Sequence, residues 1–558
     1  MSNYSVFKFR EFLNHTFMQH KSQLFIVKQQ IIVNESRFTR KTVFLFLLII
    51  GVTAFAIRFF LIPATPLSGD STNYFVYAAH TALHGKFSDI YYLTNNGWPL
   101  FLSVIFGLTS LDNPTFLMSL QKISSMFFSV ITIVPLYFLC RNFFSKSSSV
   151  FGAALFIFEP HIIINSTLGI TEPLFLFLGI SSLALFFSNN IKFTYISFAL
   201  VGLLTLIRFE GLLFFLVLSI IFLIKNRQRG RNLIQYPLML LLFVLILLPI
   251  AILNIEIHDR DSFLDELFAV SGYSYTHFVQ GEPEIGDPIY GDSNGFNMQK
   301  FLTLASTSII KFTGLLLIPI SIIFAVIGFT LIIKDRKNIR LDHKKITIVT
   351  ISIVMLLPAF YTYGRGSEDV RFLFMLCPII ILISIFTIER LKNERKNIII
   401  IIIIAAIVSA SIIYLETKKV DVEYENDVFT ITKVLASKTN LINGDSADIR
   451  YRTSVGIIEN WPNLPPPTWR GESHIERSII VIPITNEKTI IEFVEKHKEK
   501  GLSYIAVDSK QEQPEFLKEI FYNEKDYPYL NKVYDSSEFG IKYHVKFFEI
   551  DFERLNEI

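Results

Sequence analysis

The sequence predicts an α-helical polytopic membrane protein with a C-terminal extracytoplasmic α/β domain, and three observations lead to this prediction. Hydrophobic residues make up 51% of the 558 residues and charged residues only 18%, a balance that exceeds what a soluble core needs. Several apolar runs reach the ~20 residues that cross a ~30 Å hydrocarbon core. Beyond Leu415 the chain becomes charged and mixed in composition.

About eleven transmembrane helices are expected within residues 42–415. The stretch 193–224 decides the count, because as one helix it would be ~48 Å long, and Arg208 and Glu210 interrupt it. Basic residues flank both of its ends and mark the cytoplasmic face, so "IRFEG" is expected at the outer tip of a hairpin. The expected spans are 42–62, 118–139, 148–165, 171–188, 193–208, 209–224, 234–254, 311–333, 345–361, 371–388 and 397–415.

Loop charges set the expected orientation in the cell membrane. The segment 334–345 has six basic and two acidic residues and is expected inside, whereas 255–300 has nine acidic residues against Arg260 and Lys300. The net charge of +3 is too small to indicate a nucleic-acid partner. We therefore expect a cytoplasmic tail and three extracytoplasmic parts, namely 1–41 inside and 63–117, 255–310 and 416–558 outside.

Residues 416–558 combine strand-like and helix-like patterns. The strand-like runs are "LINGD", "SIIVIPI", "SYIAVD" and "VKFFEID", and they alternate with the helical patterns "NEKTIIEFVEKHKEKG" and "PEFLKEIFYNE". This alternation predicts a soluble α/β domain. The domain contains no glycine-rich nucleotide-binding motif. Two roles stay open for it: it could cover the outer face of the membrane domain, or it could recognise an acceptor.

Asp70 stands directly behind the first span, in "PLSGDSTNYFVYAAHTALHG" (66–85). The residues after Gly69 have the pattern of an amphipathic helix that ends at Gly85. Either Asp70 or Ser71 as its N-cap would contribute about 1 kcal/mol. Capping by itself explains the carboxylate, and a catalytic role is the alternative.

Two arginines lie in "YTYGRGSEDVRFLFMLCP", between two spans on the same expected face. The guanidinium groups of Arg365 and Arg371 suit phosphate oxygens, whereas an ordinary turn would pair them with Glu368 and Asp369. At the hairpin tip, an ion pair between Arg208 and Glu210 would need a break in the helix, because residues two apart point away from each other. The alternative is that these side chains snorkel to the membrane interface.

Three further side chains on this face have both a structural and a functional explanation. Glu172 precedes Pro173, so its carboxylate could simply stabilise the positive end of a helix. Glu159 and His161 could ligate a divalent metal ion, but two ligands are too few to define a site. Whether a metal is required is therefore left open.

The segment around Asp70 resembles the first outer loop of the GT-C membrane glycosyltransferases. The resemblance rests on Asp70, Tyr74, Ala78 and Gly85, followed by "NNGWPLFLSVI" (95–105). This superfamily includes protein O-mannosyltransferases, the lipid A aminoarabinose transferase and RgtA/B/C/D-like enzymes. "ITEPLFLFLGISSLALFF" and "LIRFEGLLFFL" resemble its fourth span and the next hairpin, so the similarity covers about 42–390. Many relatives have Asp-Glu where this chain has Asp70-Ser71, which weakens assignment to the O-mannosyltransferase branch.

The resemblance implies inverting transfer of a monosaccharide from a polyprenyl (dolichyl-type) phosphate to a hydroxyl group of a protein, lipid or glycan. Asp70 would be the base, a role that typically contributes about 10²–10⁴-fold. Arg371, Arg365 and Arg208 would hold the donor phosphate. Supporting roles are implied for the following residues: Glu172, Glu210, Tyr74 and Trp98.

Two other classes of function stay open. A transporter or flippase of a lipid-linked or small solute would place ionisable residues near the bilayer midplane, whereas here they gather at the span ends. A membrane-anchored assembly protein without an active site would leave Asp70 as a helix cap.

Overall fold

The computed structural model describes most of residues 39–557. The ranges outside the description are 62–64, 89–95, 189, 227–232, 259–297, 318–319, 336–341, 392–395, 418–421, 444–446, 465–478, 483, 485–486 and 510–513. Residues 1–38 of the expected tail 1–41 and most of the expected outer loop 255–310 therefore lie outside the described residues, and α2 already begins at Arg40.

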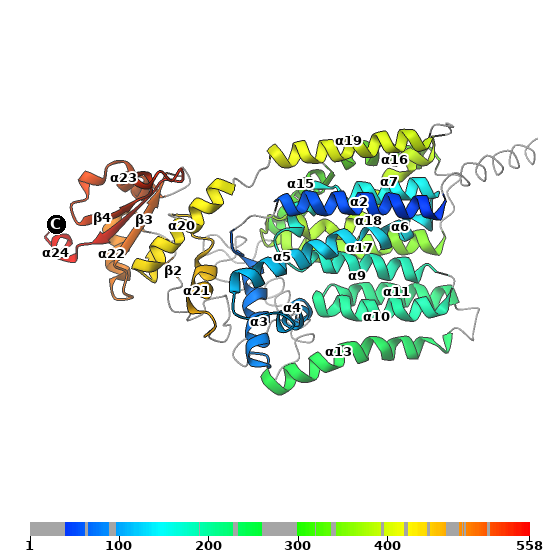
Figure 1. Cartoon of the computed structure of the whole chain (residues 1–558), viewed down its shortest axis with the longest axis horizontal. Helices are drawn as coiled ribbons and strands as arrows, with labels where there is room; N and C mark the ends of the chain where they lie inside the picture. The colour runs from blue at the N-terminus through cyan, green and yellow to red at the C-terminus, as the bar shows by residue number, and fades with distance from the viewer. Residues whose placement is uncertain are drawn as a thin grey trace, which may run out of the picture.

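Long helices lie side by side and form a bundle, with a small α/β domain at one end (Figure 1). The helices of the bundle and its loops are α2 (Arg40–Leu61), α3 (Asp70–His84), α4 (Gly97–Gly107), α5 (Pro114–Ile131), α6 (Ile133–Arg141), α7 (Lys146–Ile157), α8 (Pro160–Ser166), α9 (Glu172–Phe186), α10 (Ile191–Ile207), α11 (Gly211–Asn226), α13 (Tyr236–His258), α15 (Met298–Leu317), α16 (Ser321–Lys334), α17 (His343–Gly364), the 3-10 helix η3 (Val370–Leu376), α18 (Cys377–Glu389) and α19 (Lys396–Thr417).

The expected multi-pass helical fold is confirmed. Among the described residues, seven helical segments are long and apolar enough to cross a bilayer, and the pair α7–α8, bent by 56°, makes an eighth. Shorter apolar helices, including α9, α10, α11 and α16, account for the other expected spans. Each of the eleven expected segments falls on one of these helices or helix pairs.

One expected span, 311–333, is divided between two helices. Helix α15 ends at Leu317 and α16 begins at Ser321. Proline disfavours the helical conformation of the residue before it, and Pro319 follows the end of α15 by two positions. Helix α15 also begins at Met298, so it extends into the segment expected as an outer loop.

A buried arginine supports the bend between α7 and α8. Arg58 of α2 is completely buried, and its guanidinium donates to the Ile157 carbonyl (2.9 Å), Ser166 Oγ (3.0 Å), Ser129 Oγ (3.1 Å) and the Ala54 carbonyl (3.1 Å). The bend frees backbone acceptors at the end of α7, and these must be satisfied within the bilayer. Arg58 thus connects α2 to α5, α7 and α8.

The α/β domain is confirmed, although its sheet is small. Strands β1 (Leu441–Asn443) and β2 (Ile480–Ile482) pair in parallel, and β3 (Tyr504–Asp508), β5 (Val545–Ile550) and β4 (Leu530–Asp535) form an antiparallel sheet in that order. Its main helices are α20 (Val422–Lys438), α21 (Arg452–Asn460), α22 (Ile490–Lys498) and α23 (Glu515–Tyr522), with the short α24 (Phe552–Leu555) at the end. All four expected strands and both expected helices are present, whereas β4, α20, α21 and α24 are additional.

Helix α21 joins the domain to the outer end of the bundle. Ser454 Oγ donates to the Leu67 carbonyl (2.6 Å), and Tyr451 Oη bonds to Thr65 Oγ1 (2.9 Å). Trp461 Nε1 donates to the Leu111 carbonyl (2.7 Å), and its ring lies 6.2 Å from that of Phe75. The domain is therefore held against the loop that leads to Asp70.

Candidate functional site

Asp70 is the first residue of α3, and it does not cap that helix. The N-cap is Gly69, with φ 61° and ψ −139° and no side-chain cap bond, while Ser71 Oγ donates to the Ser68 carbonyl (2.8 Å). The expectation that Asp70 or Ser71 is the N-cap is wrong. The left-handed φ of Gly69 turns the chain so that Asp70 already lies inside the helix. Gly85 ends the helix as expected, with φ 68°.

The carboxylate of Asp70 meets Arg371, 301 positions later in the chain. Asp70 Oδ2 lies 2.7 Å from Arg371 Nη1. Asp369 begins the 3-10 helix η3 by accepting from the backbone N–H of Arg371 (2.9 Å), and its other oxygen lies 3.0 Å from Arg371 Nε. Asp369 therefore orients the guanidinium toward Asp70.

A buried glutamate links this pair to a second arginine. Glu172 Oε1 lies 2.9 Å from Arg208 Nη1 and 3.8 Å from Arg371 Nη1, and its side chain is only 5% exposed. Arg208 Nη2 in turn lies 2.8 Å from Glu210 Oε1. The five residues Asp70, Arg371, Glu172, Arg208 and Glu210 form one continuous ion-pair chain.

The helix break that this pairing needs is present at Arg208. Helix α10 ends at Ile207, and Arg208 has extended φ and ψ angles of −150° and 135° before α11 begins at Gly211. The break lets Arg208 and Glu210 point toward each other although they are two residues apart. The Arg208 guanidinium also lies over the Phe175 ring, 5.7 Å from its centre.

Two predicted supporting residues lie behind the ion-pair chain. Tyr74 follows Asp70 by one helical turn and hydrogen-bonds to Thr171; burial raises its pKa, as does the charge of Glu172, so the phenol stays protonated. Trp98 is completely buried, and its indole N–H donates to the Gly169 carbonyl (3.2 Å). Both are therefore positioned by the core beneath α3.

One important residue is absent from the sequence-based predictions. Gln121 Nε2 donates to the Gly169 carbonyl (2.7 Å) and to the Ser71 carbonyl (2.9 Å), so it fixes the first turn of α3 to the loop before α9. A buried amide within an apolar span is the signal that could have identified it. Asp369 was considered only as a turn partner, although it also orients Arg371.

Other candidates occupy separate positions. Arg365 caps the end of α17, with its guanidinium 5.9 Å from the centre of the Tyr361 ring, and Glu368 pairs with Lys311 at 3.2 Å. Glu159 Oε1 lies 3.1 Å from His161 Nδ1 and Glu159 Oε2 lies 3.2 Å from Ser321 Oγ. Within the described part of the chain, no group of three or more His, Cys, Asp or Glu side chains is placed to hold a metal ion. We assign no metal to this pair.

A narrow cavity of about 20 Å³ lies along the ion-pair chain. Its lining includes Glu172, Arg208, Glu210 and Arg371 together with the Phe175 and Phe372 rings. Aromatic and aliphatic walls around two guanidinium groups strengthen their interaction with an anion, because the local dielectric constant is low. The fold and this cluster define a multi-pass membrane protein in which two arginines and three carboxylates meet at one end of the helix bundle.

Comparisons with known proteins show a fold similar to that of solved membrane enzymes. No protein-family model and no curated protein sequence matches the chain. Similar solved structures include Archaeoglobus fulgidus oligosaccharyltransferase AglB in complex with an inhibitory peptide and a dolichol-phosphate, at TM-score 0.53, 14% identity, and 89% and 73% coverage of this chain and that one. The same enzyme in its apo form gives TM-score 0.52, 13% identity, and 85% and 70% coverage.

A second similar structure comes from a bacterium. ArnT from Cupriavidus metallidurans, bound to undecaprenyl phosphate, gives TM-score 0.50 at 9% identity, with 92% of this chain and 98% of that chain covered. The predicted resemblance to the GT-C superfamily is thus confirmed at the level of the fold.

Proposed function

We propose that this protein transfers a monosaccharide from a polyprenyl (dolichyl-type) phosphate to a hydroxyl acceptor at the extracytoplasmic face, with inversion. The observation that carries the proposal is the 2.7 Å contact between Asp70 and Arg371, which joins the candidate base to a candidate phosphate ligand. The similar structures support the donor class, because AglB was solved with dolichol-phosphate and ArnT with undecaprenyl phosphate.

Asp70 is the base in this proposal. The acceptor hydroxyl gives its proton to the Asp70 carboxylate while its oxygen forms a bond to the anomeric carbon. The bond between that carbon and the phosphate oxygen breaks, and its electron pair stays on the phosphate. Attack from the side opposite the phosphate inverts the anomeric configuration. With its side chain 52% exposed, Asp70 is accessible to an acceptor.

Arg371 and Arg208 bind the leaving phosphate. Guanidinium groups form charge-assisted and often bidentate bonds with phosphate oxygens. Because Arg371 touches Asp70, a donor phosphate on Arg371 brings the anomeric carbon within reach of the base. Glu172 holds the two arginines together from the buried side, and Glu210 holds Arg208.

We propose Arg365, which lies outside the ion-pair chain, as a third phosphate ligand on the ground of charge balance. The ion-pair chain contains three carboxylates and two guanidinium groups, and a phosphate adds further negative charge. An additional cation is therefore needed beside the donor. Arg365 lies at the end of α17, six residues before Arg371, and can supply that charge.

Incubation of the purified full chain with a panel of polyprenyl-phosphate sugars and hydroxyl acceptors tests the proposal. We expect acceptor-dependent release of free polyprenyl phosphate from one donor, and a glycoside whose anomeric configuration is opposite to that of the donor. A retained configuration would refute the direct displacement. Movement of a lipid-linked solute across a liposome membrane, without release of free polyprenyl phosphate, would favour the transporter alternative.

A further inference from the structure

A second large feature of the molecule lies outside the candidate site. An apolar groove of about 1230 Å³ runs along α2 and the continuous helices α5 and α6, which lie next to each other in Figure 1. Its lining extends from Arg40 to Phe60, about 30 Å of helix at 1.5 Å per residue. The groove therefore has the length of a bilayer hydrocarbon core.

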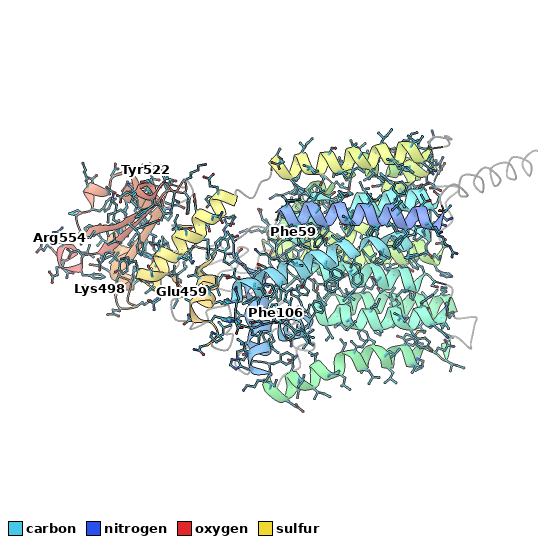
Figure 2. The ribbon with its side chains drawn as sticks, viewed as in Figure 1. Phe59, Phe106, Glu459, Lys498, Tyr522 and Arg554 are labelled. Carbon is cyan, nitrogen blue, oxygen red and sulfur yellow. The ribbon has the colours of Figure 1, made fainter. Side chains whose placement is uncertain are left out.

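The groove is open at the side. Phe44 of α2 is 69% exposed and Phe138 of α6 is 57% exposed, and both belong to its lining. Phe59 lies at the end of α2 that faces the outer loops (Figure 2). In a bilayer such an open apolar surface faces the acyl chains of lipids.

Charge is confined to one end of the groove. The lining residues at the end away from α3 include Arg40, Arg141 and Lys146, and no carboxylate is among the described residues of the lining. Arg40 begins α2, Arg141 ends α6 and Lys146 begins α7, so three separate helix ends contribute cations to the lining of the groove. Basic groups at such a position between membrane helices attract anionic lipid head groups.

We propose that this groove binds an anionic diacyl phospholipid of the leaflet opposite the candidate site. Its phosphate contacts Arg40, Arg141 and Lys146, and its acyl chains lie on the phenylalanine-rich wall. The proposal is independent of the glycosyltransferase assignment, because the groove and the ion-pair chain are formed by different helices and share no lining residue.

Gly51 provides a position at which a side chain can be added to the groove, because its Cβ position is not crowded. It lines the groove, and a Cβ added there would meet only Val130 Cγ1, at 3.8 Å. The substitution Gly51→Leu therefore projects a larger side chain into the space for the acyl chains. Lipid occupancy should fall in this variant although all three cations are retained.

Native mass spectrometry of the full chain, incubated with equimolar phosphatidylglycerol and phosphatidylcholine, tests the proposal. We expect the wild type to retain phosphatidylglycerol preferentially. The triple variant Arg40→Gln, Arg141→Gln, Lys146→Gln should lower that preference by about tenfold or more. The matched control is the triple variant Lys192→Gln, Lys225→Gln, Lys345→Gln, which removes cations from the same end of the bundle but outside the groove, and it should keep the preference.

Three results would overturn the proposal. The first is an equal preference in the groove variant and in the control, which would indicate a general surface effect. The second is unchanged retention of phosphatidylglycerol by Gly51→Leu. The third is equal retention of phosphatidylglycerol and phosphatidylcholine by the wild type, which would show that the groove has no preference for an anionic head group. Size-exclusion profiles of all variants show whether each one folds.

Discussion

Asp70 owes its position to the residue before it. Gly69 has φ 61°, which only glycine adopts without strain, and this conformation places Asp70 in the first turn of α3. The pattern of the sequence alone favours a capping aspartate at this point, because caps and catalytic carboxylates use the same residue type. The pairing with Arg371 is a tertiary contact that the sequence does not show, and it supports the catalytic role that we propose.

Replacement of Gly69 by alanine tests this dependence. A Cβ at Gly69 has no neighbour within 4 Å, so the substitution acts through backbone strain of about 1–3 kcal/mol. We expect transferase activity to fall more than the melting temperature predicts, because Asp70 moves relative to Arg371. The control is Gly107→Ala, where the added Cβ also meets nothing but φ is not left-handed. Equal activity of the two variants would contradict the role of Gly69.

Replacement of Arg371 by alanine tests the phosphate contact. Loss of a charge-assisted hydrogen bond worth about 1.5–3 kcal/mol should raise the KM for the lipid donor by about 10–100-fold. The KM for the acceptor should change much less, and Arg371→Lys should restore part of the donor affinity. Lys311→Ala is the control, since Lys311 pairs with Glu368 in the same outer region. A rise confined to the acceptor KM would show that Arg371 does not hold the phosphate.

At the scale of elements, the docking of α21 connects the α/β domain to the first outer loop. Ser454 and Tyr451 bond to Leu67 and Thr65, only a few residues before Asp70. The domain thus supports the loop that carries the candidate base, in addition to any contact with an acceptor. Sequence composition identified the domain, but contacts between residues almost 400 positions apart leave no local signal.

Truncation of Trp461 tests this docking. Trp461→Ala removes the bond to the Leu111 carbonyl and the contact with Phe75, and should weaken the interface by on the order of 2 kcal/mol. We expect limited proteolysis to release the α/β domain faster and the melting temperature to fall. The control Tyr522→Ala truncates an aromatic side chain of the same domain that is 68% exposed (Figure 2). Identical proteolysis of both variants would contradict the docking role.

The membrane-spanning helices could be predicted from the sequence because the signals that identify them are local. Apolar runs and flanking charges are local properties, and all eleven expected spans correspond to helices. The division at Leu317 was missed because the apolar run continues through Pro319. Similarly, β4 was missed because its inner residues Asn531 and Lys532 are exposed and give it no apolar pattern. The site residues are of types that are common in catalytic and phosphate-binding sites, which made them candidates. Tertiary packing brings them together, and the sequence does not show that packing.

At the scale of the whole molecule, the ion-pair chain draws on α3, α9, the α10–α11 hairpin and η3, and all of these contributions lie at one end of the bundle. The opposite end carries the basic residues of the apolar groove along α2. The orientation expected from loop charges, in which the candidate site is extracytoplasmic, stays a prediction.

Cysteine labelling in intact cells tests this orientation. Glu368 and Asp342 flank opposite ends of α17, and their side chains are 70% and 56% exposed, so each is suited to labelling. An impermeant maleimide should label the Glu368→Cys variant directly and the Asp342→Cys variant only after permeabilisation. The native cysteines, Cys140 and Cys377, are buried and give a low background. The reverse labelling pattern would show that the orientation in the membrane is opposite to the one expected.

Release of polyprenyl phosphate by the Asp70→Asn variant is the most direct measurement of the central claim, that a carboxylate touching a phosphate-binding arginine deprotonates the acceptor. Asparagine keeps the size of the side chain and cannot accept the proton. We predict that this variant inserts in the membrane, still binds the donor, and loses transfer by about 10²-fold or more. Transfer at the wild-type rate by the folded variant would contradict the claim.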